Sequence, residues 1–494
     1  MAKKARCIMV QGTMSGAGKS LLCAALCRIF AQDGLRAAPF KSQNMALNSA
    51  VTKDGLEMGR AQYMQAEAAG IEPDVRMNPV LLKPCSDTGS QVIVNGEIRA
   101  QMSAKEYFAY KKQLIPEILA AYESLAAEND VIVIEGAGSP AEINLRQDDI
   151  VNMGLAELVD APVLLAGDID RGGVFAQLYG TAALLAPSER QRIKGLIINK
   201  FRGDVGLLQP GLAQLEQLTG IPVAGVVPML KVDVDDEDSL APGLQGRSGC
   251  GAVDIAVVRL PHISNFTDFA PLATHPALSV RYVGAPAQLA EPDLVILPGS
   301  KNTMGDLGWL HQNGLEMAIR RLHGNGMPVM GICGGYQMLG ETLSDPHGVE
   351  HGGTMNGMGL LPIHTVFSPE KIRTQTKATV CAFSDAAVQG YQIHMGRTDT
   401  GTLPPFCRLT DGTVDGAVQD GVFGTYLHGL FDSGELTTAM ADWLLERKGL
   451  DKSAVALESH QDYQDRQIDI LADAVRQSLD MDAIYNIMEE YEHG

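Results

Sequence analysis

The chain has 494 residues, of which 45% are hydrophobic and 20% are charged, and its formal net charge is −20. The chain is longer than a single domain with one hydrophobic core usually is, so we expect two domains. The composition excludes a disordered chain, and the acidic balance argues against nucleic acid as a partner, because phosphate binding needs a concentrated basic surface. The chain shows no signal peptide and no apolar run near the roughly 20 residues of a membrane span, so we expect a cytoplasmic protein without a membrane partner.

The first half alternates short apolar runs with longer segments of helical periodicity. This alternation predicts an α/β domain whose mostly parallel sheet is flanked by helices. The predicted strands are Cys7–Val10, Ala37–Phe40, Val131–Ile134, Pro162–Ala166 and Leu196–Asn199. The predicted helices are Leu21–Gln32, Glu57–Ala69, Ala104–Ala127 and Val174–Leu185.

A change of composition separates the two halves. An acidic run and then a turn-rich stretch predict a linker at residues 231–252, between a first domain of residues 1–230 and a second of residues 253–494. The second domain also has an α/β pattern, and an amphipathic helix is predicted at Gln467–Tyr491. Its predicted strands are Asp254–Leu260, Leu294–Leu297, Pro328–Ile332 and Gly421–Tyr426.

A glycine-rich loop joins the first strand to the first helix. Residues 11–20 read Gln-Gly-Thr-Met-Ser-Gly-Ala-Gly-Lys-Ser. Glycines allow backbone N–H groups to converge on phosphate oxygens, while the lysine adds charge and the serine hydroxyl can bind Mg²⁺. A chance Gly-Lys-Ser sequence is the alternative, since Thr13 stands where the common pattern has its first glycine. We expect ATP to contact Gly12, Thr13, Gly16, Gly18, Lys19 and Ser20.

Carboxylates and amides at strand ends complete the predicted nucleotide site. Glu135 ends the strand Val131–Ile134, where it and Ser20 can bind one Mg²⁺ ion, although a surface carboxylate is the alternative. Three other residues at strand-end loops are candidates for metal or substrate binding: Lys41, Asp149 and Asp168. Asn199 is expected at the adenine edge, or else as a turn former.

A second motif surrounds Cys333. The sequence Gly331-Ile-Cys-Gly-Gly335 lies between a predicted strand and a helical pattern, which predicts a nucleophile elbow with a thiol. The Gly334 N–H can face an oxyanion, and Gly299, at another strand end, can supply a second donor. A buried structural cysteine is the alternative.

A thiol nucleophile needs a base within reach. His428 follows the predicted strand Gly421–Tyr426 and is the best candidate, whereas His394 either shapes the site or ends a strand. No glutamate stands two residues after His428, so the sequence leaves the third partner of the Cys-His pair open.

Taken together, these motifs resemble those of the cobyric acid synthase family over essentially the whole chain. The resemblance rests on residues 11–20 and on Phe40–Ser49, Glu57–Gln62, Asn78–Pro84, Glu135–Leu145, Asp168–Gly173 and Gly331–Gly340.

The resemblance implies a P-loop NTPase-like, dethiobiotin-synthetase-like ATP domain followed by a class I glutamine amidotransferase-like domain. It further implies that the b, d, e and g carboxylates of (adenosyl)cobyrinic acid a,c-diamide become amides, with ATP, Mg²⁺ and glutamine as reactants. Cys333 and His428 would release the ammonia. Two alternatives stay open: a cobyrinic acid a,c-diamide synthase, and a regulatory or assembly ATPase whose thiol domain only binds a ligand.

Overall fold

The computed structural model describes residues 5–84, 89–144, 146, 148–234, 251–452, 455 and 457–492. Its first half is built on a six-stranded parallel sheet with the order β12-β11-β10-β1-β9-β2. The strands are β1 (Arg6–Gly12), β2 (Ala37–Phe40), β9 (Val131–Glu135), β10 (Val163–Asp168), β11 (Ile193–Phe201) and β12 (Val223–Pro228). The five strands predicted for this half are confirmed.

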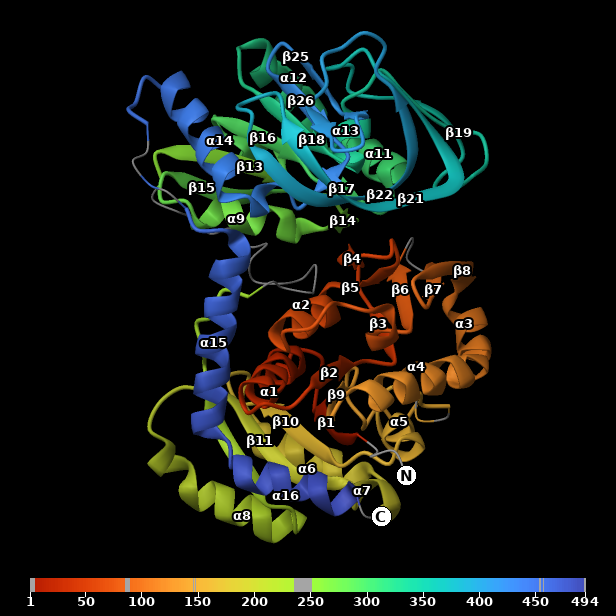
Figure 1. Cartoon of the computed structure of the whole chain (residues 1–494), viewed down its shortest axis with the longest axis vertical. Helices are drawn as coiled ribbons and strands as arrows, with labels where there is room; N and C mark the ends of the chain where they lie inside the picture. Colours follow the sequence, from red (N-terminus) through yellow and green to blue (C-terminus); the bar gives the residue numbers. More distant parts are fainter. Residues whose placement is uncertain are drawn as a thin grey trace.

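Helices cover both faces of this sheet (Figure 1). Side chains alternate along β1, so Cys7 and Met9 join the core on one face, whereas Ile8 and Val10 join the core on the other. The first face is covered by α4 (Ile115–Glu128), α5 (Met153–Leu158), α6 (Val174–Leu184) and α8 (Gln209–Thr219). The second is covered by α1 (Lys19–Gln32), α2 (Arg60–Ala68), α15 (His460–Ser478) and α16 (Met481–Glu492).

Between β2 and α4 the chain adds short strands that the sequence analysis does not predict. They form a sheet of order β3-β6-β7-β8 and a hairpin of β4 with β5. The strands are β3 (Gln43–Met45), β4 (Ser49–Val51), β5 (Glu57–Gly59), β6 (Val80–Pro84), β7 (Gly89–Val94) and β8 (Glu97–Ser103). The other short helices of this half are η1 (Val75–Met77), α3 (Ala104–Tyr110), η2 (Lys111–Leu114), α7 (Pro187–Arg190) and η3 (Val205–Leu208).

Two predicted helices have different bounds in the structure. The helix predicted to start at Glu57 starts at Arg60, because the three residues before it form β5. The segment Ala104–Ala127 is divided into α3, the 3-10 turn η2 and α4. Pro116 lies in the first turn of α4, where its missing N–H needs no partner, so this position favours a new helix start.

The second half has its own six-stranded sheet, with the order β15-β13-β16-β18-β26-β25. All neighbours in it are parallel except β25 with β26. The strands are β13 (Val253–Val258), β15 (Leu278–Val283), β16 (Leu294–Leu297), β18 (Val329–Ile332), β25 (Ala417–Gln419) and β26 (Val422–Thr425). The helices are η5 (Phe266–Phe269), α9 (Ala270–Thr274), α10 (Pro286–Leu289), α11 (Thr303–Asn313), α12 (Leu315–Gly324), α13 (Gly334–Met338), η6 (Leu430–Asp432) and α14 (Gly434–Arg447). The α/β prediction is therefore confirmed for both halves.

A long antiparallel hairpin lies beside this sheet and was not predicted. It consists of β21 (His364–Val380) and β22 (Ala387–Asp399), and β22 contacts β4 of the first half (Figure 1). The smaller strands around it are β14 (Ile263–Ser264), β17 (Gly299–Ser300), β19 (Thr342–Asp345), β20 (Gly353–Asn356), β23 (Cys407–Leu409), β24 (Val414–Asp415) and β27 (Leu427–His428).

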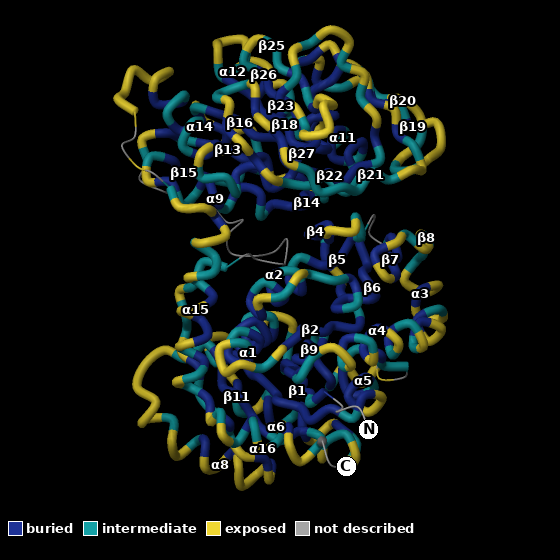
Figure 2. The backbone as a smooth tube through the Cα atoms, in the orientation of Figure 1, coloured by how far each residue is buried: buried dark blue, intermediate teal, exposed yellow. Residues whose placement is uncertain are grey.

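The C-terminal segment returns to the first half. Figure 1 shows α15 leaving the second half and running along the first, and Figure 2 shows buried positions along it. Leu471 and Val475 of α15 and Met488 of α16 share the core of α1. The sequence predicts one helix here, as part of the second domain. The structure instead has two helices, divided at Leu479, which forms a β-bridge with Gly225 of β12.

The predicted linker falls mostly on residues 235–250, which lie outside the described residues. Among the described helices, none combines the length and the apolar composition needed to cross a membrane.

Candidate functional site

The glycine-rich loop connects β1 directly to α1. Gly18 precedes the helix in a left-handed conformation (φ 89°), and a Cβ atom there would lie 2.3 Å from Nδ2 of Asn199. Lys19 lies across the loop, and its ammonium group donates to the carbonyl oxygens of Met14 (3.0 Å) and Gly138 (3.2 Å). The loop therefore presents backbone amides and a cation at a helix N-terminus, as a phosphate site requires.

The turn at the start of the loop explains why its first glycine is Gly12, one residue before the position in the common pattern. A Cβ atom on Gly12 would lie 2.9 Å from the Ala17 side chain, so the close turn requires glycine at this position. The Thr13 N–H extends the pairing of β1 with β10 by donating to the Ala166 carbonyl (2.9 Å). The Thr13 hydroxyl donates to the Gln177 side chain (3.1 Å). Thr13 can therefore occupy the common glycine position without strain.

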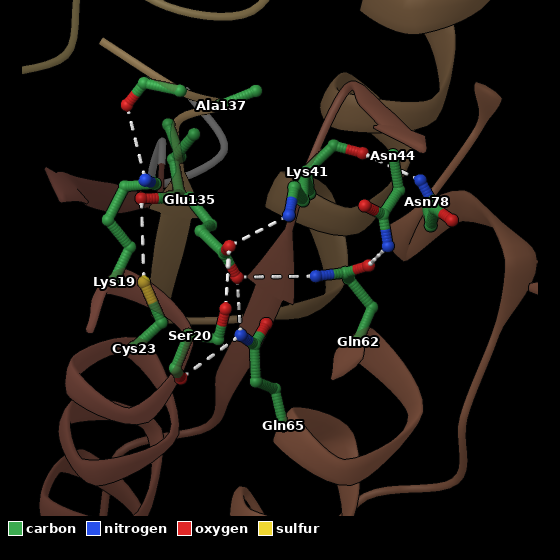
Figure 3. A network of polar contacts seen from close by, with 12 residues as sticks. Lys19, Ser20, Cys23, Lys41, Asn44, Gln62, Gln65, Asn78, Glu135 and Ala137 are labelled. Carbon is green, nitrogen blue, oxygen red and sulfur yellow. Dashed lines mark hydrogen bonds and ion pairs between the residues drawn. The ribbon is translucent and has the colours of Figure 1, made fainter. Parts of the chain in front are cut away.

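Glu135 is the centre of a buried polar network (Figure 3). Its Oε1 atom accepts hydrogen bonds from the hydroxyl of Ser20 (2.9 Å) and the ammonium of Lys41 (2.8 Å). Its Oε2 atom accepts from the side-chain amides of Gln62 (3.3 Å) and Gln65 (2.7 Å). Burial raises the pKa of Glu135, but the charge and hydrogen bond of Lys41, the Gln65 hydrogen bond and the Lys19 charge outweigh burial and hold the pKa below its ordinary value.

This network brings together three residues that the sequence analysis selected, namely Ser20, Lys41 and Glu135. It also contains Gln62 and Gln65, which that analysis missed. A signal for them existed, because two glutamines three residues apart lie on the buried side of α2.

The oxygen atoms of Ser20 and Glu135 are the type of ligand that Mg²⁺ prefers. They are direct neighbours, with Lys41 beside them. Within the described parts of the chain, no group of three or more His, Cys, Asp or Glu side chains could hold a metal ion. The residues present therefore fit a metal that takes further ligands from phosphate and water.

Asp168 and Asn199 both brace the phosphate loop. Asp168 ends β10 and pairs with Lys200 (2.9 Å), whose ammonium also donates to the Gly16 carbonyl (2.6 Å). The Asn199 side-chain amide donates to the Ala17 carbonyl (2.9 Å). Both residues thus lie at the predicted site, and a contact of Asn199 with adenine stays a prediction.

Asp149 has a different environment. Its Oδ1 atom accepts the N–H groups of Val151 (2.8 Å) and Asn152 (3.0 Å), and its Oδ2 atom accepts that of Gly154 (3.0 Å). This pattern is typical of a carboxylate that holds the start of a helix, here α5. The geometry favours this structural role, and a role of Asp149 toward metal or substrate stays a prediction.

In the second half, Cys333 stands at a sharp turn between β18 and α13. Its backbone adopts φ 53° and ψ −108°, which is unusual for a residue with a side chain. A Cβ atom on Gly331 would lie 2.6 Å from the Gly335 carbonyl oxygen, and one on Gly335 would lie 2.0 Å from the Leu297 carbonyl oxygen. The flanking glycines therefore allow the close packing that forces Cys333 into this strained, elbow-like conformation.

His428 lines the same pocket as Cys333, on the short strand β27. Its Nδ1 atom lies 2.6 Å from Oδ2 of Asp268, and the other oxygen of Asp268 accepts the Gly429 N–H (3.1 Å). Burial disfavours the charged imidazole, but the Asp268 charge and hydrogen bond, together with the Cys333 thiol, raise the pKa of His428 to about 10. Asp268 is therefore the third partner that the sequence left open.

Asp268 could not be paired with His428 from the sequence, because the two residues lie 160 positions apart. One signal existed: an aspartate stands between two phenylalanines, Phe266 and Phe269, which are buried in η5. A carboxylate in such a setting needs a polar partner.

Two backbone positions selected for the oxyanion lie beside the thiol. A Cβ atom on Gly299 would lie 3.2 Å from the His428 ring, and one on Gly334 would lie 2.9 Å from the Ser300 nitrogen. Gly334 and the Gly299–Ser300 strand therefore lie side by side, next to Cys333 and His428. Donation of their N–H groups to an oxyanion stays a prediction.

His394 also lines the pocket. Its Nδ1–H donates to the Gly396 carbonyl (2.8 Å), and its ring stacks on Tyr426. Burial lowers the pKa of His394 to about 4, so its ring is neutral and shapes the pocket.

The thiol pocket reaches the first half of the chain. Lys83 of β6 and Lys371 of β21 both line it, and both pair with the buried carboxylate of Glu57. Burial lowers the pKa of Lys371 to about 8, against the opposing charge of Glu57. Side chains of both halves therefore enclose the pocket.

Two family models match the sequence. Residues 8–239 match the CobQ/CobB/MinD/ParA nucleotide binding domain, and residues 254–436 match the CobB/CobQ-like glutamine amidotransferase domain. These ranges contain the phosphate loop with Glu135 and the Cys333–His428–Asp268 centre, respectively.

Curated relatives match almost the whole chain. It is 55% identical to the cobyric acid synthase of Ruminiclostridium cellulolyticum over 98% of both chains. It is 56% identical to that of Klebsiella pneumoniae over 98% of both chains, and 54% identical to that of Photorhabdus laumondii over 99% of both. The chain therefore belongs to the cobyric acid synthase family, whose members are ligases that contain a glutamine amidotransferase domain.

Proposed function

We propose that the protein is a cobyric acid synthase that uses ATP, Mg²⁺ and glutamine to amidate the b, d, e and g carboxylates of (adenosyl)cobyrinic acid a,c-diamide. The observation that carries this proposal is the similarity to cobyric acid synthases over nearly the full length of the chain. The presence of a phosphate loop and a thiol centre in one chain supports the same reaction.

In the first half, the loop of residues 11–20 binds the ATP phosphates, and Lys19 adds positive charge. Ser20 and Glu135 would hold Mg²⁺, which supplies charge neutralisation at the phosphates. Lys41, paired with Glu135, lies at the same spot and can orient the incoming carboxylate. Transfer of the γ-phosphoryl group to that carboxylate gives an acyl phosphate, which is a reactive electrophile.

In the second half, the Cys333 sulfur attacks the side-chain amide carbon of glutamine. With its raised pKa, His428 already holds the proton that the thiol gives up and passes it to the departing ammonia, while Asp268 holds the imidazole orientation. The N–H groups near Gly299 and Gly334 stabilise the oxyanion. Water then hydrolyses the thioester to glutamate, and ammonia displaces phosphate from the activated corrin carboxylate.

Product analysis tests the proposal. The purified protein is incubated with ATP, Mg²⁺, glutamine and either cobyrinic acid or its a,c-diamide, and mass spectrometry counts the amides gained. We expect the a,c-diamide to gain amides at the b, d, e and g positions. Amidation of cobyrinic acid at the a and c positions alone would instead indicate an a,c-diamide synthase, and no ammonia release from glutamine would indicate a binding module.

A further inference from the structure

The thiol pocket contains a carboxylate that the mechanism above does not use. Glu350 lies in the loop between β19 and β20, is partly exposed, and lines the pocket with Cys333 and His428. Its Oε2 atom accepts the Met304 N–H (3.1 Å), and its Oε1 atom lies 3.3 Å from the Thr303 hydroxyl.

Glu350 is close to the nucleophile. The Thr303 hydroxyl that contacts it lies 3.1 Å from the position of a Cβ atom on Gly334, the residue directly after Cys333. The same hydroxyl lies 3.2 Å from the side chain of Gln337, whose backbone N–H donates to the Cys333 carbonyl (3.1 Å). One hydroxyl therefore connects the carboxylate to the turn that carries the thiol.

A helix cap alone does not explain Glu350. The side chain of Asn302 already caps α11 by accepting the Gly305 N–H (3.1 Å). Among the described residues, no cationic side chain forms an ion pair with Glu350. Burial raises the pKa of Glu350 to about 7, against the weaker opposing effects of the Met304 N–H and the Lys301 charge. A partly exposed carboxylate that forms no ion pair and lines the pocket of the thiol is placed to bind a cationic group of a ligand.

We propose that Glu350 binds the α-ammonium group of the substrate glutamine, an inference that rests on the proposed glutamine-hydrolysing function. Glutamine is a zwitterion that carries its α-ammonium several bonds from the amide carbon that Cys333 attacks. Lys301 and Lys371 line the same pocket, so the α-carboxylate also meets opposite charge there. Glu350 thus selects a free amino acid over other amides.

The test compares glutamine with glutaramate, the analogue that lacks only the α-amino group. The glutaminase kcat/KM is measured for the wild type, for Glu350→Gln and for a matched control, Glu341→Gln, which alters an exposed glutamate before the same loop. For Glu350→Gln we expect kcat/KM for glutamine to fall about 100-fold, mainly through KM, since a lost charge-assisted contact penalises only the ligand that makes it. Its activity on glutaramate and its ammonia-supported amidation stay unchanged, as do all activities of Glu341→Gln.

Equal losses on glutamine and glutaramate would overturn the proposal in favour of a structural role, and so would an unchanged KM for glutamine. If Glu350→Gln fails to fold, the ratio of kcat/KM for glutamine to kcat/KM for glutaramate is compared between the wild type and Glu350→Asp. A wild-type ratio below about 10, or an unchanged ratio in Glu350→Asp, overturns the proposal. A wild type that releases no ammonia from either amide would instead refute the proposed function.

Discussion

The two halves of the molecule each bury a carboxylate, but the partners of these carboxylates differ. Glu135 accepts hydrogen bonds from four side chains that belong to the phosphate loop, the end of β2 and helix α2. Both oxygens of Asp268 contact one short segment: Oδ2 lies beside the His428 ring, and Oδ1 accepts the Gly429 N–H. The first arrangement gathers polar groups around a nucleotide site, and the second fixes the orientation of one imidazole. Because the two buried acids have different environments, we expect them to have different roles.

The comparison also predicts that the two centres act in separable half-reactions. The largest effect is expected for Cys333→Ser and His428→Ala. Glutamine-supported amide synthesis should fall at least about 1,000-fold, because either change removes a member of one catalytic unit. Synthesis from ammonium at alkaline pH should stay within about twofold of the wild type, because the thiol takes no part in carboxylate activation. The measurement is amide yield with each nitrogen source, and equal loss with both sources in a folded variant would contradict the separation.

The reverse pattern is expected for Lys19→Ala and Glu135→Gln. Amide formation should fall about 100-fold or more with either nitrogen source, because each change removes charge at the nucleotide site. Glutamine hydrolysis should persist at least in part and serves as the internal control for folding. Normal ATP-dependent synthesis by Lys19→Ala would show that the loop does not bind phosphate.

Within the second half, Asp268→Asn tests whether Asp268 acts together with Cys333 and His428. Glutaminase activity should fall by about 100-fold to 10,000-fold, because an amide no longer holds the productive tautomer of His428. Ammonia-supported synthesis should survive. Asp420→Asn, which changes an exposed aspartate of the same half, is the matched control. A glutaminase rate close to that of the wild type would remove Asp268 from the catalytic unit.

The Asp268–His428 pair should make the free energy of unfolding depend on pH. The folded pKa of His428, about 10, lies above the value of roughly 6.5 expected for an unfolded chain. The pair therefore adds stability that is fully present below about pH 6.5 and is lost as the pH rises through about 10. Thermal unfolding of the wild type and Asp268→Asn should differ most at low pH and converge toward pH 10. A difference that grows with pH would contradict the raised pKa.

The smallest effect is expected for Asp149→Ala. Because its carboxylate accepts three backbone N–H groups at the start of α5, the loss should lower stability by about 1–2 kcal/mol. Turnover of the folded enzyme should change little. Chemical denaturation and steady-state kinetics on the same preparation test this expectation, and a large loss of turnover at unchanged stability would return Asp149 to the metal or substrate site.

The sequence by itself identified what depends on contiguous residues. The phosphate loop and the Cys333 turn need glycines at fixed spacings between a strand and a helix, and both motifs are visible in the sequence. Most of the parallel strands were equally visible, because burial on both faces produces uninterrupted apolar runs. The parallel strands β12 and β15, at the sheet edges, were not predicted. The mixed polar strands β21 and β22 carry no such signal and were missed.

Only the tertiary structure decided which distant groups meet. Asp268 reaches His428 across 160 residues, and Gln62 and Gln65 reach Glu135 once α2 packs against β2, the neighbour of β9. The C-terminal helices pack on the first half through α1, although they follow the second half in the chain. The physical reason is that backbone conformation is set by neighbouring residues, whereas hydrogen-bond partners and packing faces are set by how the elements assemble.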